Sequence, residues 1–214
     1  QIYPNWELCI ADASPEGQEI PWLVEQLSLD CDKIKYKKLD QNKGISGNTI
    51  EAMQMASGEF IALLDHDDII APNALYEYAK ALEDDPGIDF FYSDKDMIDE
   101  SGSHRINPLY KPEYSPEIMY SANYLTHFCV IRTSVLKQTQ GFDPNTDGAQ
   151  DWDIFLKVME VTDRFKRIDR ILYHWRILST SVASGVEAKP YALDAQLYAL
   201  RHYIADRNWP GEVY

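Results

Sequence analysis

The chain has 214 residues, enough for one sizeable α/β domain or two small ones, and its 45% hydrophobic content argues against disorder. A formal net charge of −15 argues against nonspecific binding to nucleic acid, which needs a basic surface. The three cysteines, Cys9, Cys31 and Cys129, form neither a disulfide framework nor a zinc spacing, which favours a reducing compartment.

The sequence contains no signal peptide and no apolar span of membrane length. We therefore expect a cytoplasmic location, which includes the inner face of the cell membrane if missing segments or partners hold the chain there. The opening Gln1-Ile2-Tyr3-Pro4 is not typical of a natural start and favours a fragment of a longer chain.

Predicted strands and helices alternate through the first half of the chain. Strands are expected at residues 6–12, 34–40, 61–64 and 88–94, and helices at 19–29, 49–56 and 73–82. Strands separated by helices indicate a parallel sheet with right-handed crossovers. Because Asp12, Asp65 and Asp94 each end a predicted strand, we expect these carboxylates at one edge of the sheet, where ligands bind in open α/β folds.

The acidic cluster Asp65-His66-Asp67-Asp68 directly follows the apolar residues 61–64. Crowded carboxylates repel one another unless a cation lies between them, and hard oxygen ligands suit Mg²⁺ or Mn²⁺ shared with substrate phosphates. The alternative is an acidic turn that caps the next helix, which we favour for Asp68 alone. For Asp65 and Asp67 we favour metal, because a helix start needs only one cap.

The second half of the chain is less regular. Residues 97–120 are polar and contain three prolines, and they predict a long connection with a short β-ribbon. The elements expected after it are a strand at 126–132, a short helix at 134–139, an amphipathic helix at 151–161, strand structure within 165–175 and a final helix at 190–208. The loop at 177–186 is rich in serine and glycine, and it is a candidate lid over a bound donor.

Several motifs occur in a characteristic order. They are Asn42-Lys43-Gly44-Ile45-Ser46-Gly47, Leu64-Asp65-His66-Asp67-Asp68, Tyr92-Ser93-Asp94-Lys95-Asp96, Gly148-Ala149-Gln150-Asp151-Trp152-Asp153 and Tyr173-His174-Trp175-Arg176. The ordered set resembles the inverting glycosyltransferases of family 2, in the branch that makes bacterial surface polysaccharides such as rhamnose-rich polymers and O-antigens. One Asp-x-Asp alone would be a weak signal, whereas the ordered set covers nearly the whole chain.

The resemblance implies one α/β domain with the GT-A fold, in which helices flank a mostly parallel central sheet and the acceptor side is antiparallel. Residues 1–96 would form the nucleotide-sugar-binding half and residues 97–214 the acceptor and catalytic half. Members of this family usually begin with another strand, so we expect an exposed strand edge or apolar surface where it would lie. Ile50 stands where the family usually has an asparagine, which puts that asparagine's role in holding the loop in doubt.

The implied activity is metal-dependent transfer of a sugar, with inversion, from a nucleotide-diphosphate sugar to a hydroxyl of a glycan or lipid-linked acceptor, with Mn²⁺ or Mg²⁺ as cofactor. The residues that match family positions are Asp151 as catalytic base, Asp67 and His174 as metal ligands, and Asp12, Lys43, Gly44, Asp65, Asp94 and Arg176 as contacts to the nucleotide-sugar donor.

Structural interpretations of these residues remain open. Asp151 lies at a predicted helix start, where the macrodipole favours a carboxylate, but first-turn acids are common there. His174 shares a strand face with Arg176, yet a lone histidine on a strand is more often a hydrogen-bonded structural residue. Asp12 could be a turn cap, and Trp152 could pack in the core or stack on an acceptor.

Two other functions remain possible from the residues alone. A nucleotidyltransferase could use the same sheet edge, although residues 13–17 lack the basic glycine-rich loop typical of that class. A non-catalytic fragment that binds sugar nucleotides is the second alternative.

Overall fold

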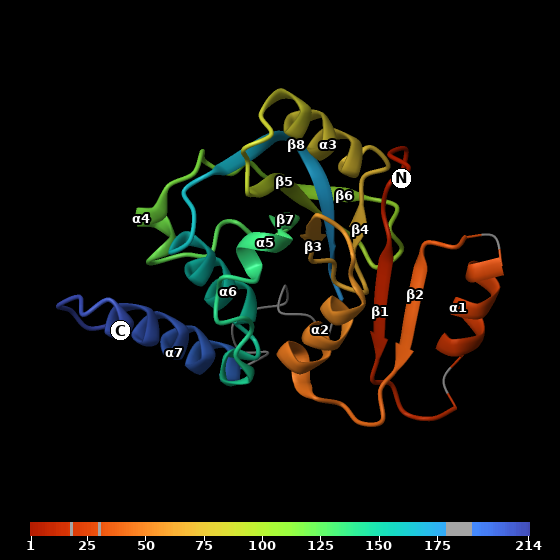
Figure 1. Ribbon diagram of the computed structural model, residues 1–214, viewed down its shortest axis with the longest axis horizontal. Coiled ribbons are helices and arrows are strands. Elements are labelled where there is room, and N and C mark those ends of the chain that lie inside the picture. Colours follow the sequence, from red (N-terminus) through yellow and green to blue (C-terminus); the bar gives the residue numbers. More distant parts are fainter. Residues whose placement is uncertain (18, 30, 179–189) are drawn as a thin grey trace.

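The computed structural model describes residues 1–17, 19–29, 31–178 and 190–214 (Figure 1). Most of the predicted lid, residues 179–186, lies outside the described residues. The elements of the first half are β1 (Leu8–Asp12), α1 (Ile20–Leu29), β2 (Ile34–Lys38), α2 (Gly44–Met55), β3 (Phe60–Ala62), β4 (Ile69–Ile70), α3 (Ala74–Asp84) and β5 (Phe90–Ile98). Those of the second half are β6 (Arg105–Leu109), α4 (Pro116–Met119), β7 (Cys129–Arg132), α5 (Thr133–Leu136), η1 (Pro144–Thr146), α6 (Gln150–Met159), β8 (Phe165–Arg176) and α7 (Pro190–Asp206).

The central sheet is mixed. Its strand order is β3-β7-β5-β8-β4, with β6 paired to β5 off this path, and β1 and β2 form a separate two-stranded sheet. The α/β class with flanking helices and an antiparallel portion is confirmed. The mostly parallel sheet is not, because β5–β8 and β1–β2 are parallel whereas β3–β7, β4–β8, β5–β6 and β5–β7 are antiparallel. After β5 the chain turns back through the β6 hairpin and β7 instead of crossing over through a helix.

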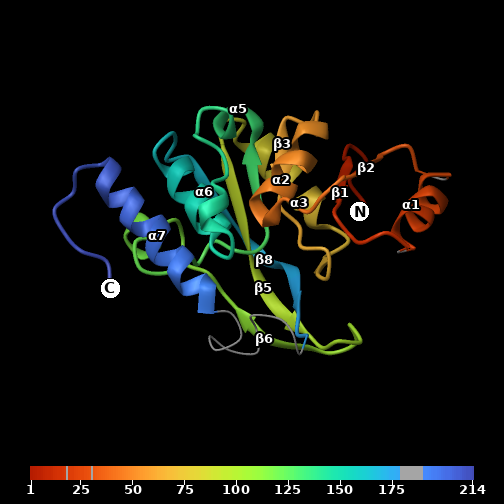
Figure 2. The same ribbon diagram turned by 90° about the horizontal axis from the view of Figure 1, so that it is seen from below.

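Side chains of β5 alternate between two hydrophobic cores, as expected for a buried strand. Phe90 and Tyr92 lie in the core that contains Ile154, Phe155 and other residues of α6 and α7. Phe91 points the other way, into the core formed with Tyr78 of α3. Figure 2 shows α6 and α7 on one side of β5 and α3 on the other. The sheet is therefore covered on both faces, which fixes where its loops emerge.

Three element boundaries differ from the predictions, and each affects a site residue. Helix α2 begins at Gly44, so the glycine-bearing loop forms its first turn. Strand β5 continues through Asp94 to Ile98, because it pairs with β8 along its whole length. Strand β7 begins at Cys129, which leaves His127 in the segment before the strand. Asp94 is therefore inside a strand and does not end one.

The unit formed by β1, β2 and α1 lies beside the main sheet (Figure 1). The Glu7 carboxylate, just before β1, accepts a hydrogen bond of 3.0 Å from the backbone N–H of Gly58, close to the start of β3. Helix α1 leaves Trp22, Leu27 and Leu29 more than half exposed. No helix within the described residues is long and apolar enough to cross a membrane.

Candidate active site

Two acids from distant parts of the chain meet at one histidine. Asp65 follows β3, Asp151 lies in the first turn of α6, and His127 precedes β7. The Nε2 atom of His127 is 3.4 Å from Asp65 Oδ2 and 3.7 Å from Asp151 Oδ2. The structure thus brings the candidate base next to the Asp-x-Asp motif, as the sequence motifs imply for a donor site facing an acceptor site.

The electrostatics of this cluster favour protonation of the acids. Burial, together with the charge of Asp65, raises the pKa of Asp151 to about 7. Withdrawal from water, followed by the charges of Asp68 and Asp67, raises the pKa of Asp65 to about 6. Lys95 of β5 opposes both shifts, and its ammonium lies 4.6 Å from the centre of the Trp175 ring. When both acids are ionised they repel each other, and a cation between them would relieve this repulsion.

The loop that carries the Asp-x-Asp motif is fastened to β8. Asp68 accepts hydrogen bonds from the Tyr173 hydroxyl and, at 2.7 Å, from the backbone N–H of Arg176. Asp68 therefore anchors this loop and does not cap α3, whose N-cap residue is Asn73. The Arg176 guanidinium donates to the Asp67 and Glu100 carbonyl oxygens, each at 2.7 Å. Its described contacts thus hold the loop, and its contact with a diphosphate stays a prediction.

His174 is oriented by a carboxylate. Its Nδ1 lies 2.6 Å from Asp96 Oδ1, and Asp96 Oδ2 accepts from Arg105 Nε at 2.6 Å. A carboxylate on one ring nitrogen is how metal-binding histidines are commonly held, and it leaves Nε2 for a ligand. No group of three His, Cys, Asp or Glu side chains that could hold a metal ion occurs in the described part of the chain. Binding of a metal ion by Asp67 and His174 therefore stays a prediction.

The loop at Lys43 and Gly44 docks onto the segment that leads to α6. The Asp147 carboxylate accepts hydrogen bonds of 2.8 Å from the backbone N–H groups of both Ile45 and Ser46. The amides at the start of α2 are thus satisfied by a protein carboxylate. Lys43 forms an ion pair of 2.5 Å with Glu51, so its described partner is on α2. Contacts of Lys43 and Gly44 with the donor remain predictions.

Asp12 ends β1, as predicted, and is buried. It accepts hydrogen bonds from Tyr36 Oη at 2.7 Å, Ser14 N at 2.8 Å and Lys38 Nζ at 3.1 Å. Burial opposes its ionisation, but these three donors hold the pKa of Asp12 well below its usual range. The described contacts fit the turn-cap interpretation, and the contact with a nucleotide base stays a prediction.

Asp94 is 1% exposed, and both of its carboxylate oxygens accept hydrogen bonds. It pairs with Arg167 through Nη2 at 2.7 Å and Nε at 3.1 Å, and it accepts from the Lys111 backbone N–H at 2.9 Å. The expectation that Asp12, Asp65 and Asp94 share one edge of one sheet was wrong. Strand β1, which Asp12 ends, lies in a separate two-stranded sheet, Asp65 comes after the end of β3, and β5 runs past Asp94. The ion pair ties β5 to β8 and makes Asp94 part of the sheet interior.

The comparison with protein families decides the class. The model described as Glycosyl transferase family 2 matches residues 1–139. The chain belongs to glycosyl transferase family 2.

Relatives of this family 2 domain match nearly all of it. An uncharacterized protein of Sinorhizobium fredii, y4gI, is 33% identical over 207 residues, which are 96% of this chain and 23% of that protein. The O-antigen biosynthesis protein RfbC of Myxococcus xanthus is 30% identical over 213 residues, which are 100% of this chain and 17% of that protein. The chain therefore spans less than a quarter of the length of either relative.

Solved structures share the fold. TarS from S. aureus in complex with UDP-GlcNAc has a TM-score of 0.74 at 19% identity and covers 96% of this chain and 60% of its own. The mannosyltransferase PcManGT from Pyrobaculum calidifontis, in complex with GDP-Man and Mn²⁺, has a TM-score of 0.59 at 15% identity. The match covers 97% of this chain and 67% of that chain. At these identities the likeness shows the fold alone, which is the expected GT-A fold.

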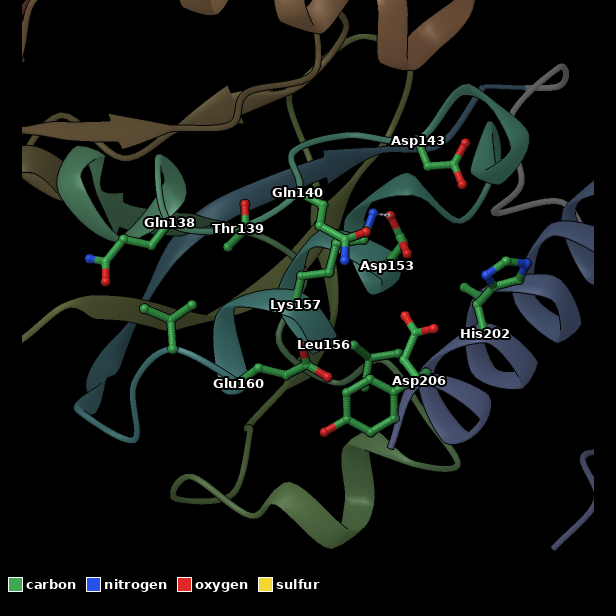
Figure 3. Close-up of a pocket in the computed structure, with 13 residues that line it drawn as sticks. Gln138, Thr139, Gln140, Asp143, Asp153, Leu156, Lys157, Glu160, His202 and Asp206 are labelled. Atoms are coloured by element: carbon green, nitrogen blue, oxygen red, sulfur yellow. Dashed lines mark hydrogen bonds and ion pairs between the residues drawn. The ribbon is translucent and has the colours of Figure 1, made fainter. Parts of the chain in front are cut away.

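Within this glycosyltransferase domain, the acids of α6 face different surroundings. Asp153 pairs with Lys157 at 2.6 Å and lines a cavity of about 160 Å³ between α6 and α7 (Figure 3). His202 and Asp206 of α7 line the same cavity, whereas Asp151 faces His127. Trp152 is buried, and its Nε1 donates to the Met119 carbonyl at 2.7 Å, which favours core packing over acceptor stacking.

His127 is the site residue that sequence reasoning missed. It stands at the head of the apolar residues 128–131, where a histidine is more often structural, and no motif singles it out. The signal is spatial: its ring lies between two acids that the sequence does identify.

Proposed function

We propose that this family 2 domain transfers a sugar, with inversion, from a nucleotide-diphosphate sugar to a hydroxyl of a glycan or lipid-linked acceptor in surface polysaccharide biosynthesis. The observation that carries the proposal is the meeting of Asp65 and Asp151 at the His127 ring. Asp65, as the acid that binds the donor, and Asp151, as the base on the acceptor side, both lie within 4 Å of His127 Nε2. They are therefore close enough to act on the donor and on the acceptor of one transfer reaction. An O-antigen biosynthesis protein among the sequence relatives, and the UDP-GlcNAc bound to a protein of the same fold, support the same substrate class.

Asp151 is the proposed catalytic base. The acceptor hydroxyl must lose its proton as the sugar is transferred, and a carboxylate opposite the leaving diphosphate can accept it. A pKa of about 7 matches this role, because a base works best when its pKa is near the working pH. Asp65, across the His127 ring, would hold the ribose or the sugar of the donor.

The acidic residues fit a divalent cation. Burial, and after it the like charges of Asp68 and Asp67, raise the pKa of Asp65. Carboxylate oxygens are the ligands that Mg²⁺ and Mn²⁺ prefer. Asp67 and His174 would hold the ion, with phosphate oxygens of the donor completing the set, since the described residues offer no three-ligand group. When bound, the ion would stabilise the negative charge that develops on the leaving diphosphate. The Mn²⁺ in the mannosyltransferase complex supports this assignment.

Thermal unfolding with nucleotides tests the proposal. UDP, GDP and dTDP should be screened with and without Mn²⁺, and one nucleotide with Mn²⁺ is expected to raise Tm, as binding at about 100 times Kd adds about 2.7 kcal/mol. Asp67→Ala should abolish the rise. Asp206→Ala, which removes an acid from the α6–α7 cavity, should keep it. No shift with any nucleotide would overturn the proposal.

A further inference from the structure

The His127 ring is held independently of the two acids it faces. It stacks on the Tyr173 ring with centroids 5.0 Å apart and planes 17° apart. The buried Lys111 ammonium donates to the Leu125 carbonyl at 2.7 Å and to the His127 carbonyl at 2.6 Å. Tyr173 is itself fastened through its hydroxyl to Asp68. These contacts hold the imidazole without help from the two acids, and its Nε2 faces Asp65 and Asp151.

The protonation state of the ring follows from its surroundings. Burial, with the nearby Lys95 and Lys111 charges, lowers the pKa of His127 to about 3, so the ring is neutral. Its Nδ1 is buried and has no hydrogen-bond partner among the described residues. A proton on Nδ1 would lack an acceptor and would turn the Nε2 lone pair towards two carboxylates. The single ring proton therefore belongs on Nε2.

We propose that His127 is a positioning residue that shares the hydrogen bond of its one Nε2–H between Asp65 and Asp151. When bound donor engages Asp65, this hydrogen bond is directed to Asp151 alone. The inference rests on the proposed function and adds a coupling between donor binding at Asp65 and proton acceptance at Asp151. The contacts of 3.4 and 3.7 Å are both longer than a normal N–H···O hydrogen bond. Such lengths fit a donor between two acceptors, and catalytic hydrogen bonds commonly tighten only when substrate is bound.

The consequence is that donor binding activates the base. A hydrogen bond from Nε2–H stabilises the ionised form of Asp151 and fixes its orientation towards the acceptor. His127 keeps its proton throughout, so no proton passes through it. The other groups that act on Asp151 are Asp65, Lys95 and the neighbouring Gln150, and all three stay unchanged in variants of His127.

The test compares variants that keep or lose a donor at the Nε2 position. His127→Phe keeps a ring against Tyr173 and removes the N–H, whereas His127→Gln places an amide N–H at similar reach. The readout is release of nucleoside diphosphate from a panel of UDP-, GDP- and dTDP-sugars with Mn²⁺, with water as acceptor. For His127→Phe we expect kcat to fall about 10- to 100-fold with little change in KM. The pH midpoint of kcat should rise by about one unit, and His127→Gln should restore both.

Protein folding is checked by Tm and by nucleoside-diphosphate binding. If His127→Phe does not fold, His127→Asn takes its place, because its shorter amide reaches the Nδ1 position and should fail where His127→Gln succeeds. The inference would be overturned if His127→Gln lost as much kcat as His127→Phe and the pH midpoint of kcat stayed unchanged. Where His127→Asn replaces His127→Phe, the same comparison with His127→Gln applies. If wild type turns over, Asp151→Asn does not and His127→Phe matches wild type, the inference fails while the proposed function stands. If wild type neither binds nucleotide nor releases it, both fail together.

Discussion

Asp147 accepts a hydrogen bond of 2.8 Å from the backbone N–H of Ser46, more than a hundred residues earlier in the chain. Its other carboxylate oxygen accepts from Ile45 at the same distance, so the first turn of α2 is clamped to the segment that leads into α6. Because Asp151 lies at the start of α6, this clamp helps to set the position of the candidate base. The glycine-bearing motif therefore has a structural task besides any contact with the donor.

Gly44→Ala should break this clamp. Gly44 has φ +79, and a Cβ built there would lie 2.3 Å from Asp147 Oδ2. Backbone strain alone costs about 1–3 kcal/mol, and displacing the carboxylate adds to it. We expect urea unfolding to show a loss of about 2–4 kcal/mol, with a fall in kcat as Asp151 shifts.

Gly17→Ala is the matched control for Gly44→Ala. Gly17 has φ +85, but a Cβ there would meet no atom of the described residues within 4 Å, so Gly17→Ala measures the backbone strain without a steric clash. A loss as large as that of Gly44→Ala would mean that backbone strain explains both and that the Asp147 clamp adds nothing.

Asp94→Ala should destabilise the sheet. The buried Asp94 faces Arg167 at 2.7 Å, and removing one partner of a buried pair typically costs about 3–5 kcal/mol, since the other charge is left uncompensated. Asp169→Ala is the control, because Asp169 contacts the same Arg167 at 2.9 Å but is 85% exposed, and exposed pairs contribute about 0–1 kcal/mol. Denaturant unfolding measures both. If Asp94→Ala instead keeps its stability and loses nucleotide binding, the residue acts on the donor.

The sequence predicted the alternation of elements in the first half and singled out Asp65 and Asp151, which the structure places beside one histidine, because apolar periodicity and ordered motifs are local properties. It did not predict that β5 passes through Asp94, since the extra strand length comes from pairing with β8, a partner distant in the chain. It also placed the start of α2 five residues late. The first turn of that helix depends on Asp147, whose contact no local pattern reveals.

His127 shows the same limit within the site. Its place in the candidate site depends on where β3, β7 and α6 meet. The sequences of these three elements contain no pattern that predicts a role for His127. Arg176 and His174 illustrate the converse case. The sequence predicted that both lie on one strand, and β8 contains both. Their partners, the Asp67 carbonyl oxygen for Arg176 and the Asp96 carboxylate for His174, are set by tertiary structure.

Stability should fall as the pH rises from about 4 towards 7. The folded pKa of Asp151, about 7, lies above its ordinary value of 3.8, so folding favours the protonated form. The stability contributed by this group is fully present below about pH 4 and is lost as the pH rises towards 7. The effect has an upper limit of about 4 kcal/mol, at 1.36 kcal/mol per pKa unit.

Thermal unfolding of Asp151→Asn between pH 4 and 8 measures this effect. The variant should gain stability relative to wild type as the pH rises, because an amide does not ionise. Asp65→Asn should show a smaller gain in stability as the pH rises, since it removes the charge that helps to raise the pKa of Asp151. A constant difference between wild type and Asp151→Asn across this range would contradict the raised pKa.

Asp151→Asn should separate binding from turnover. The amide keeps the size of the side chain and removes its ability to accept the acceptor proton, so kcat should fall by about 10²- to 10⁴-fold, as is typical for loss of a general base. Nucleoside-diphosphate binding, measured by calorimetry with Mn²⁺, should persist. Asp153→Asn is the control on the same helix, because Asp153 pairs with Lys157 and lines the cavity beside α7 (Figure 3). It should keep its turnover once Tm confirms that it folds. Turnover retained by Asp151→Asn would remove this residue from the mechanism, and the base would then have to be sought among the other acids near His127.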